Sequence, residues 1–308
     1  MPLLTRPRMT IERVMPPPLF PVQDSERTLL RPSKSGLLET CSNASCRSGW
    51  LHLWRSRSAP VVAGGWTCSA ACTTERLRAA VARELEGRVP AAEKHHHRIP
   101  LGLIMLEQGW ITVSQLRGAL QSQCENRAGR LGHWLVTKEG VSEELITRAL
   151  GLQWSCPVLP LESHHSEGLA PILPRFFVDA FGALPLRIAA GKIIYLGFED
   201  RLDPVLALAV ERISGHRVES GLVQGSLFQA AHARMLQAVF PHVELLEAAS
   251  EPALVRALAR RVEQARPIDS RLVRVHDCLW LRMWTRPQSG PVPEPSSIQD
   301  VICTISVR

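Results

Sequence analysis

Residues 100–153 read PLGLIMLEQGWITVSQLRGALQSQCENRAGRLGHWLVTKEGVSEELITRALGLQ, and this segment holds two copies of one motif, 30 residues apart. The copies share identical residues at five pairs of positions: Leu101/Leu131, Gly102/Gly132, Ala119/Ala149, Leu120/Leu150 and Gln123/Gln153. An internal repeat is a strong guide to architecture, because each copy must form the same supersecondary unit. We therefore expect two similar units in the middle of the chain.

Each copy is predicted to form two helices joined by a turn. A short helix opens at the Leu-Gly step, a turn follows at Gly109 or Gly140, and Thr112 or Ser142 caps a second helix. The second helix of each copy carries apolar residues at the i, i+3 and i+4 spacing of one helix face. Each copy is thus expected to be a helical hairpin. Two such hairpins are too small to bury their faces alone, so we expect them to pack as a pseudo-symmetric four-helix unit.

The rest of the chain predicts an α+β fold in several parts. We expect a disordered leader (1–40), a small cysteine-rich unit with a helix (41–90), a linker (91–98), the tandem helical repeat (99–156), an α+β module packed with it (157–240) and a C-terminal α+β piece (250–308). In the cysteine-rich unit, strands are expected at 50–54 and 61–66 and a helix at 73–88. The module should hold strands at 183–188, 192–198 and 216–223 with helices at 203–214 and 226–235. The C-terminal piece should hold a helix at 252–264 and strands at 272–276, 278–284 and 301–307.

The composition favours a folded, cytoplasmic protein. The chain has 308 residues, of which 45% are hydrophobic and 21% are charged, and this length suffices for two or three ordinary domains. No apolar run approaches the roughly 18 residues needed to span a bilayer. Arg and Pro residues interrupt the N-terminus where a signal peptide needs a continuous apolar run. We therefore expect neither a membrane span nor secretion.

No sequence motif indicates a catalytic nucleophile or a loop that binds nucleotide phosphates. The pattern GxxxxGK[ST] is absent, because Gly191-Lys192 is followed by Ile193 and has no glycine at the required spacing. The patterns GxSxG, HExxH and GxGxxG are absent as well. We therefore expect that the chain is not an enzyme.

The repeat and the segment after it resemble a known family. The tandem pattern is RLGxx, two apolar residues, xxG, two apolar residues, then xxxxLxxxLxxQ, where x is any residue. It is followed by LPLRIAAGKIIYLGFEDRLDP and GHRVES. Over residues 98–238 this resembles the MshEN-type N-terminal domain of type II secretion and type IV pilus assembly ATPases, here as a stand-alone chain without the motor. In that family the tandem motifs can bind cyclic di-GMP, and related domains dock the ATPase onto an inner-membrane protein. The resemblance implies a regulatory or docking module whose partner is a component of secretion or pilus machinery, either an inner-membrane docking protein or an ATPase.

The resemblance also implies a candidate cyclic di-GMP site. The matching residues are Leu101, Gly102, Gly109 and Gln123 in the first motif, and Arg130, Leu131, Gly132 and Gln153 in the second; Trp134 is added because guanine could stack on it. An arginine supplies a planar cation for guanine or phosphate. However, Pro100 stands where the first arginine is expected, and Glu139 where the inner glycine of the second motif is expected, although Gly140 follows directly. Arg98 is a candidate replacement for the missing arginine. Two interpretations stay open: a site that binds cyclic di-GMP, and a domain that has kept the fold and lost or weakened the ligand.

Four cysteines in the N-terminal part form two close pairs. Cys41 and Cys46 are followed, after 21 residues, by Cys68 and Cys72. Two short-spaced pairs can bring four soft ligands together around a tetrahedral zinc ion. Because four thiolates leave no open coordination position, the expected zinc-ribbon-like unit has a structural metal. Reduced buried thiols and redox chemistry are the alternatives.

The first third of the chain is basic, and this raises an alternative function. Residues 1–98 carry 15 Lys/Arg against 8 Asp/Glu, whereas residues 99–308 carry 21 of each. Arg47, Arg55 and Arg57 lie near Trp50 and Trp54, which would permit contacts to phosphates and stacking on bases. Nucleic-acid binding through this region is therefore the alternative. A solvated strand over a tryptophan core explains the same residues, so nucleic acid is not the expected partner.

Overall fold

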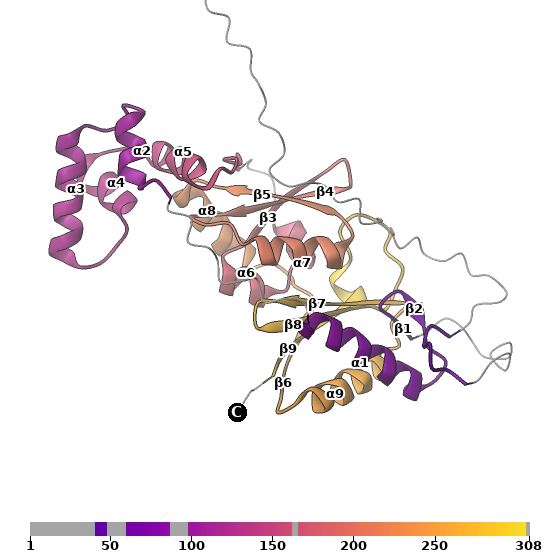
Figure 1. Ribbon diagram of the computed structural model, residues 1–308. Helices are drawn as coiled ribbons and strands as arrows, with labels where there is room; N and C mark the ends of the chain where they lie inside the picture. The colour runs from indigo at the N-terminus through magenta and orange to yellow at the C-terminus, as the bar shows by residue number, and fades with distance from the viewer. Residues whose placement is uncertain (1–40, 48–59, 87–97, 162–165, 306–308) are drawn as a thin grey trace, which may run out of the picture. The chain divides into compact units, whose positions relative to one another are not determined.

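The computed structural model describes residues 41–47, 60–86, 98–161 and 166–305. The expected leader at 1–40, the strand at 50–54 and nearly all of the linker at 91–98 lie outside these residues. The described residues belong to one unit, Leu37–Arg308, and form an α+β fold, as expected (Figure 1). No helix in the described segments has both the length and the apolar character needed to cross a bilayer.

The repeat forms four helices where they were predicted. They are α2 (Leu101–Glu107), α3 (Val113–Asn126), α4 (Leu131–Glu139) and α5 (Glu143–Trp154). Thr112 caps α3 in a complete capping box with Gln115, and Ser142 caps α5. Gly109 and Gly140 adopt φ of 68° and 67° in the two turns, a conformation that favours glycine. Local sequence signals therefore place the starts of these helices and the turns between them correctly.

The helices pair between the copies, which differs from the expected hairpins. Helix α2 packs against α5, and α3 packs against α4, so the first helix of each copy meets the second helix of the other. A shared core lies between them, formed by Ile104, Met105, Ile111, Ala119, Leu135, Val141 and Ala149. Leu120 belongs to the apolar face predicted for the second helix of the first copy, and that prediction was wrong for this residue, which is 47% exposed. Its repeat equivalent Leu150 instead packs on the core of the α+β module.

The α+β module follows the predicted order and adds two elements. It contains β3 (Leu184–Ala189), β4 (Ile193–Phe198), α7 (Pro204–Ser214), β5 (Arg217–Leu222) and α8 (Gly225–Met235). Strand β3 is antiparallel to β4, whereas β5 is parallel to β4 because α7 crosses over between them. The additional elements are the 3-10 helix η2 (Ser166–Ile172) and α6 (Arg175–Phe181).

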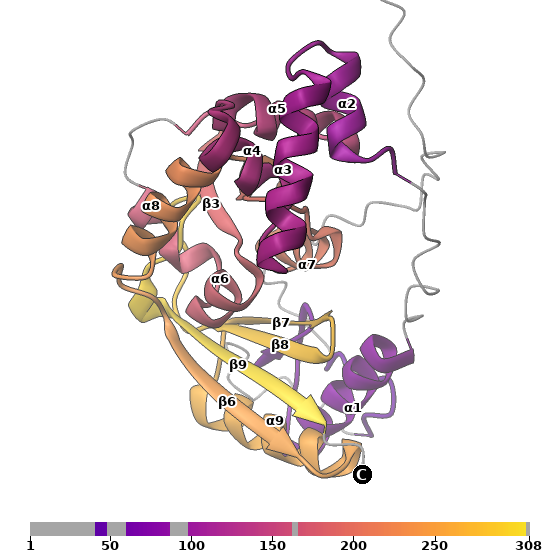
Figure 2. The same cartoon turned by 90° about the vertical axis from the view of Figure 1, so that its left-hand side faces the viewer.

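The C-terminal part is a four-stranded sheet in the order β6-β9-β8-β7 (Figure 2). Its elements are β6 (His242–Ala248), α9 (Glu251–Ala265), β7 (Asp269–Val275), β8 (Cys278–Trp284), the 3-10 helix η3 (Pro295–Ser297) and β9 (Ile298–Ile305). Strand β6 was not predicted, because its sequence HVELLEA mixes charges into a short edge strand. Trp280, Trp284 and Ile302 join the core of the α+β module. Leu279, Leu281 and Met283 belong to a second core with α1 and α9.

The N-terminal elements lie on the C-terminal sheet. They are β1 (Val61–Val62), β2 (Gly65–Trp66) and α1 (Ala70–Glu86). The single strand predicted at 61–66 is wrong, because Ala63 and Gly64 take positive φ and fold the segment into a small hairpin. Helix α1 packs beside α9 (Figures 1 and 2). The apolar cores include residues from more than one expected domain. The expected domain boundaries stay predictions.

Candidate functional site

The glutamine that ends each motif donates a hydrogen bond to the backbone just before the other copy. Gln123 Nε2 donates to the carbonyl of Gly129 at 3.0 Å, and Gln153 Nε2 donates to the carbonyl of Ile99 at 2.8 Å. Gly129 and Ile99 are equivalent residues of the two copies, 30 positions apart. Each glutamine thus anchors the backbone that leads into the first helix of the other copy.

The Leu-Gly steps form a seam where the first helix of each copy meets its own second helix and the first helix of the other copy. A Cβ at Gly102 would lie 2.6 Å from Leu116 Cδ1 and 3.3 Å from Leu131 Cδ2. A Cβ at Gly132 would lie 2.9 Å from Ile146 Cγ2 and 3.8 Å from Leu101 Cδ2. The two glycines therefore permit close packing of helix on helix, in the same way in both copies. This brings Leu101, Gly102, Leu131 and Gly132 together around a local two-fold axis.

Arg130 is the motif residue that faces the α+β module. It is the N-cap residue of α4, its side chain is 75% exposed, and it forms an ion pair with Asp200 in the loop after β4. Burial, and then the neighbouring charge of Asp200, raises the pKa of Glu199. Arg130 therefore lies beside two carboxyl groups of the module. An anionic ligand that binds Arg130 would have to displace Asp200 from the ion pair. Asp200 is not part of either motif.

Trp134 and Gly109 have local roles. The Trp134 indole Nε1 donates to the carbonyl of Ala128 at 3.0 Å, and its ring meets His133 edge-on. Trp134 therefore packs on the loop that carries Arg130. A Cβ at Gly109 would have open space around it, so the positive φ of this residue accounts for the glycine.

A second cationic group lies where the first motif lacks its arginine. The guanidinium of Arg98 lies over the Trp154 ring, 3.3 Å from the centroid, and Arg201 lies 5.7 Å from the same ring. Trp154 also packs on the core of the α+β module. The sequence had indicated Arg98 as a replacement for the arginine missing at Pro100. The position of Arg201 near the same ring is set by the tertiary fold.

Glu143 joins the repeat to the module. Its carboxylate accepts hydrogen bonds from the backbone N of Ser226 at 3.1 Å and from Gln224 Nε2 at 3.3 Å. Hydrogen bonding from Ser226 lowers the pKa of the Glu143 carboxyl. Glu143 lies in the first turn of its own helix, α5, where a negative charge is favoured. It also caps the start of α8, 83 residues further along the chain.

The four cysteines of the N-terminal part meet in space. Their Sγ atoms all lie within 4.8 Å of one another, and Cys68 Sγ is 3.6 Å from both Cys46 Sγ and Cys72 Sγ. Zn–S bonds of about 2.3 Å in a tetrahedron place the sulfurs about 3.8 Å apart. Asn43 Nδ2 is directed at Cys72 Sγ at 3.3 Å, as a donor that would support a thiolate ligand. The donor set and its spacing therefore fit a zinc ion.

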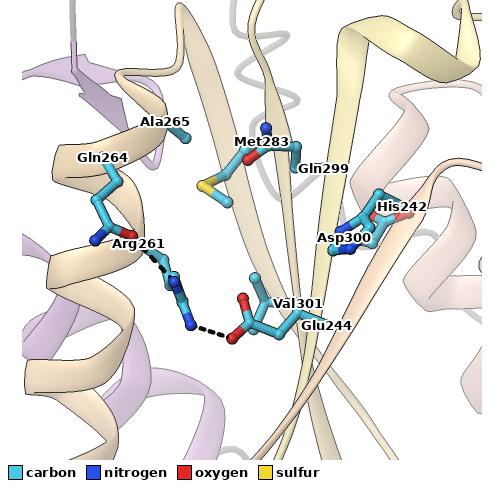
Figure 3. Close-up of a pocket in the computed structure, with 9 residues that line it drawn as sticks. All are labelled: His242, Glu244, Arg261, Gln264, Ala265, Met283, Gln299, Asp300 and Val301. Atoms are coloured by element: carbon cyan, nitrogen blue, oxygen red, sulfur yellow. Dashed lines mark hydrogen bonds and ion pairs between the residues drawn. The ribbon is translucent and has the colours of Figure 1, made fainter.

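A separate hollow of about 300 Å³ lies between α9 and the sheet, and Figure 3 shows the residues that line it. Arg261 from α9 crosses it and pairs with Glu244 of β6 at 2.5 Å, while its other Nη atom donates to Gln264. Arg261 and Glu244 thus neutralise each other, and Asp300, which also lines the hollow, pairs with Arg282. It is not the site that the motifs predict.

No family model matches the sequence. Bacteriophage adsorption protein B of Escherichia coli (strain K12) is 33% identical over 125 residues, which is 40% of this chain and 16% of that protein. Bacteriophage N4 adsorption protein B of Escherichia coli O157:H7 matches with the same identity and coverage. The chain therefore spans less than a fifth of the length of these relatives.

Solved structures give a partial match. A structure of MshE with cdg is 24% identical, covers 45% of this chain and 99% of that chain, and has a TM-score of 0.36. A structure of the N-terminal domain of XpsE is 18% identical, covers 44% of this chain and 92% of that chain, and has a TM-score of 0.29. A second crystal form of the XpsE domain gives 19% identity, 48% and 98% coverage and a TM-score of 0.24.

Proposed function

We propose that this chain is a non-enzymatic regulatory or docking module related to the N-terminal domains of type II secretion and type IV pilus assembly ATPases, and that its helical repeat binds cyclic di-GMP. The observation that carries the proposal is the reciprocal pair of hydrogen bonds, Gln123 to Gly129 and Gln153 to Ile99. These bonds join equivalent positions of the two copies in the same way. A ligand with two equivalent guanylate halves suits such an arrangement.

Arg130 is the residue proposed to bind the ligand by charge. Its guanidinium is planar and can pair with guanine or phosphate, and it lies at the N-terminus of α4, where anions are favoured. Its present partner Asp200 forms an exposed ion pair, which is worth at most about 1 kcal/mol. An anion can therefore displace Asp200 at small cost. Arg98 is proposed as the second cation, since it lies in the segment that Gln153 holds.

The competing proposal is a domain that has kept the fold and lost the ligand. Pro100 removes one arginine of the motif pair, and the carboxylates of Glu199 and Asp200 face the remaining one. In that case the repeat and the module would serve as a docking surface alone. Under both proposals the chain acts in the cytoplasm, and its partner is an inner-membrane docking protein or an ATPase of secretion or pilus machinery.

Calorimetric titration of the full chain with cyclic di-GMP separates these two proposals. We expect micromolar binding that Arg130→Ala abolishes and that Arg117→Ala, an exposed arginine on α3, leaves unchanged. Binding by Pro100→Arg but not by the parent chain would mean a degenerate site on an intact fold. No heat from either chain would exclude the ligand and leave docking as the proposed function.

We also propose that Cys41, Cys46, Cys68 and Cys72 hold a structural zinc ion. The sulfur spacing and the Asn43 donor support this proposal. Four thiolate ligands would cross-link residues 41–46 to residues 68–72 and offer no position to a substrate. Mass spectrometry of metals in the reduced protein should find about one zinc per chain. Nucleic-acid binding stays the alternative function for this region, and its key residues Trp50, Trp54, Arg55 and Arg57 lie outside the described residues.

A further inference from the structure

The cysteine cluster lies at one end of a unit that we call the N-terminal unit, made of residues 41–47, the hairpin β1–β2 and α1. The first cysteine pair is tied to the hairpin by Ser42, whose N and Oγ both donate to the Trp66 carbonyl, at 2.9 and 2.8 Å. None of residues 41–47 is buried. Apolar packing therefore does not hold this segment, and a metal ion at the four sulfurs would be its principal anchor.

The hairpin covers the start of an edge strand of the C-terminal sheet. Strand β7 is the last strand in the order β6-β9-β8-β7. Val61 N donates to the Pro267 carbonyl at 2.9 Å, and Ala63 N donates to the Ser270 carbonyl at 3.0 Å. The buried Ser270 hydroxyl donates to the Val61 carbonyl at 2.8 Å, across 209 residues of sequence. The hairpin thus satisfies backbone groups that an open sheet edge would expose.

Helix α1 covers an apolar face beside that edge. Leu77 and Val81 are fully buried in one core with Leu254 and Leu258 of α9. Near the end of α1, the Glu84 carboxylate accepts hydrogen bonds from Arg212 of α7 and from the backbone N of Arg274 in β7. Since Cys72 lies in the first turn of α1, the metal site and this cover are parts of one continuous element.

We propose that metal bound at Cys41, Cys46, Cys68 and Cys72 acts as a clasp that keeps the N-terminal unit on the C-terminal sheet. The inference rests on the proposed zinc site and adds a consequence to it. With zinc bound, the hairpin closes the β7 edge and α1 covers α9. Loss of zinc frees the hairpin and the start of α1, and uncovers the β7 edge and the apolar face of α9.

Hydrogen exchange of the full chain, measured under reducing conditions, tests the clasp. Three states are compared: the zinc-loaded protein, the same protein after treatment with a zinc chelator, and the chelated protein after zinc is restored. Chelation should speed exchange at least tenfold in residues 61–86, 251–265 and 269–275, because these amides then open locally. Zinc should restore the protection, and residues 101–154 of the repeat should not respond.

Two serine variants complete the design. Cys46→Ser removes one proposed ligand and should reproduce the chelated state, whereas Cys124→Ser changes an exposed thiol outside the cluster and should behave like the parent chain. A zinc-loaded protein whose α9 and β7 exchange equally with and without metal would overturn the clasp and leave the zinc site standing. Zinc below about 0.3 per chain in the parent would overturn both proposals. Faster exchange throughout residues 101–154 would indicate global unfolding and would also overturn a local clasp.

Discussion

The side chain of Gln153 donates a hydrogen bond of 2.8 Å to the backbone carbonyl of Ile99, 54 residues earlier in the chain. Its repeat equivalent Gln123 does the same to Gly129. Each of the two bonds joins the end of one copy to the start of the other. The glutamines that end the motifs therefore hold the two-fold arrangement, whether or not a ligand binds beside them.

Replacement of either glutamine by alanine should loosen this arrangement. We expect Gln123→Ala and Gln153→Ala each to lower the free energy of unfolding by about 1 kcal/mol, the usual net value of one hydrogen bond. Urea denaturation monitored by circular dichroism measures the change. Gln121→Ala is the matched control, because Gln121 lies on the same helix and bonds only to its helix neighbour Glu125 among the described contacts. Equal losses for Gln121 and Gln123 would contradict the proposed role.

A methyl group at the seam should be poorly tolerated. Gly132→Ala would place its Cβ 2.9 Å from Ile146 Cγ2, on a stiff β-branched side chain. We expect a loss of about 1–3 kcal/mol from overpacking, although alanine is otherwise the better helix former. Gly102→Ala meets the flexible end of Leu116 and should cost less. Thermal unfolding shows which of the two variants loses more stability. Gly290→Ala, whose Cβ would meet open space, is the control and should leave stability almost unchanged.

The carboxyls of Glu143 and Glu199, which lie where the repeat meets the module, should change the stability of the fold with pH in opposite directions. Hydrogen bonding from Ser226 lowers the pKa of Glu143 below its ordinary value of 4.5. The stability due to Glu143 is therefore present above pH 4.5 and is lost as pH falls through the folded pKa. Burial raises the pKa of Glu199 above the same value, so stability falls as the pH rises from 4.5 to the folded pKa, and the loss is complete above it.

Two glutamine variants check these signs. Glu143→Gln should reduce stability at neutral pH and flatten the acid side of the pH profile. Glu199→Gln should increase stability at neutral pH and flatten the profile just above pH 4.5. Chemical denaturation between pH 3 and pH 8 measures both profiles. A loss of neutral-pH stability in Glu199→Gln would contradict the burial argument.

Glu84 should contribute most of the polar contact of α1 with the rest of the fold. Its side chain is 10% exposed and receives both Nη atoms of Arg212 as well as the backbone N of Arg274. We expect Glu84→Gln to cost about 1–3 kcal/mol, since it weakens charge-assisted hydrogen bonds. Hydrogen exchange in residues 70–86 measures the opening of the helix. Glu86→Gln, two residues away and exposed, is the control and should leave exchange unchanged.

The helices of the repeat could be predicted because their signals are local. The caps at Thr112 and Ser142 and the turn glycines Gly109 and Gly140 act within a few residues of the chain, and the 30-residue repeat presents each signal twice. The cysteine pairs predicted a metal site for a similar reason, since two short spacings each place two sulfurs close together. Strand β6 escaped prediction because an edge strand with mixed charge has a weak pattern.

The sequence by itself determined which residues repeat and most of the helices and strands, apart from β6, η2, α6 and the hairpin at 61–66. Only the tertiary structure decided that α2 packs on α5 rather than on α3, that Arg130 meets Asp200, and that Glu84 joins α1 to α7 and β7. The physical reason is that helix formation depends on hydrogen bonds and side-chain spacing within four residues. The choice among packing partners depends instead on contacts between residues far apart in the sequence, such as Arg130 with Asp200, which periodicity does not encode.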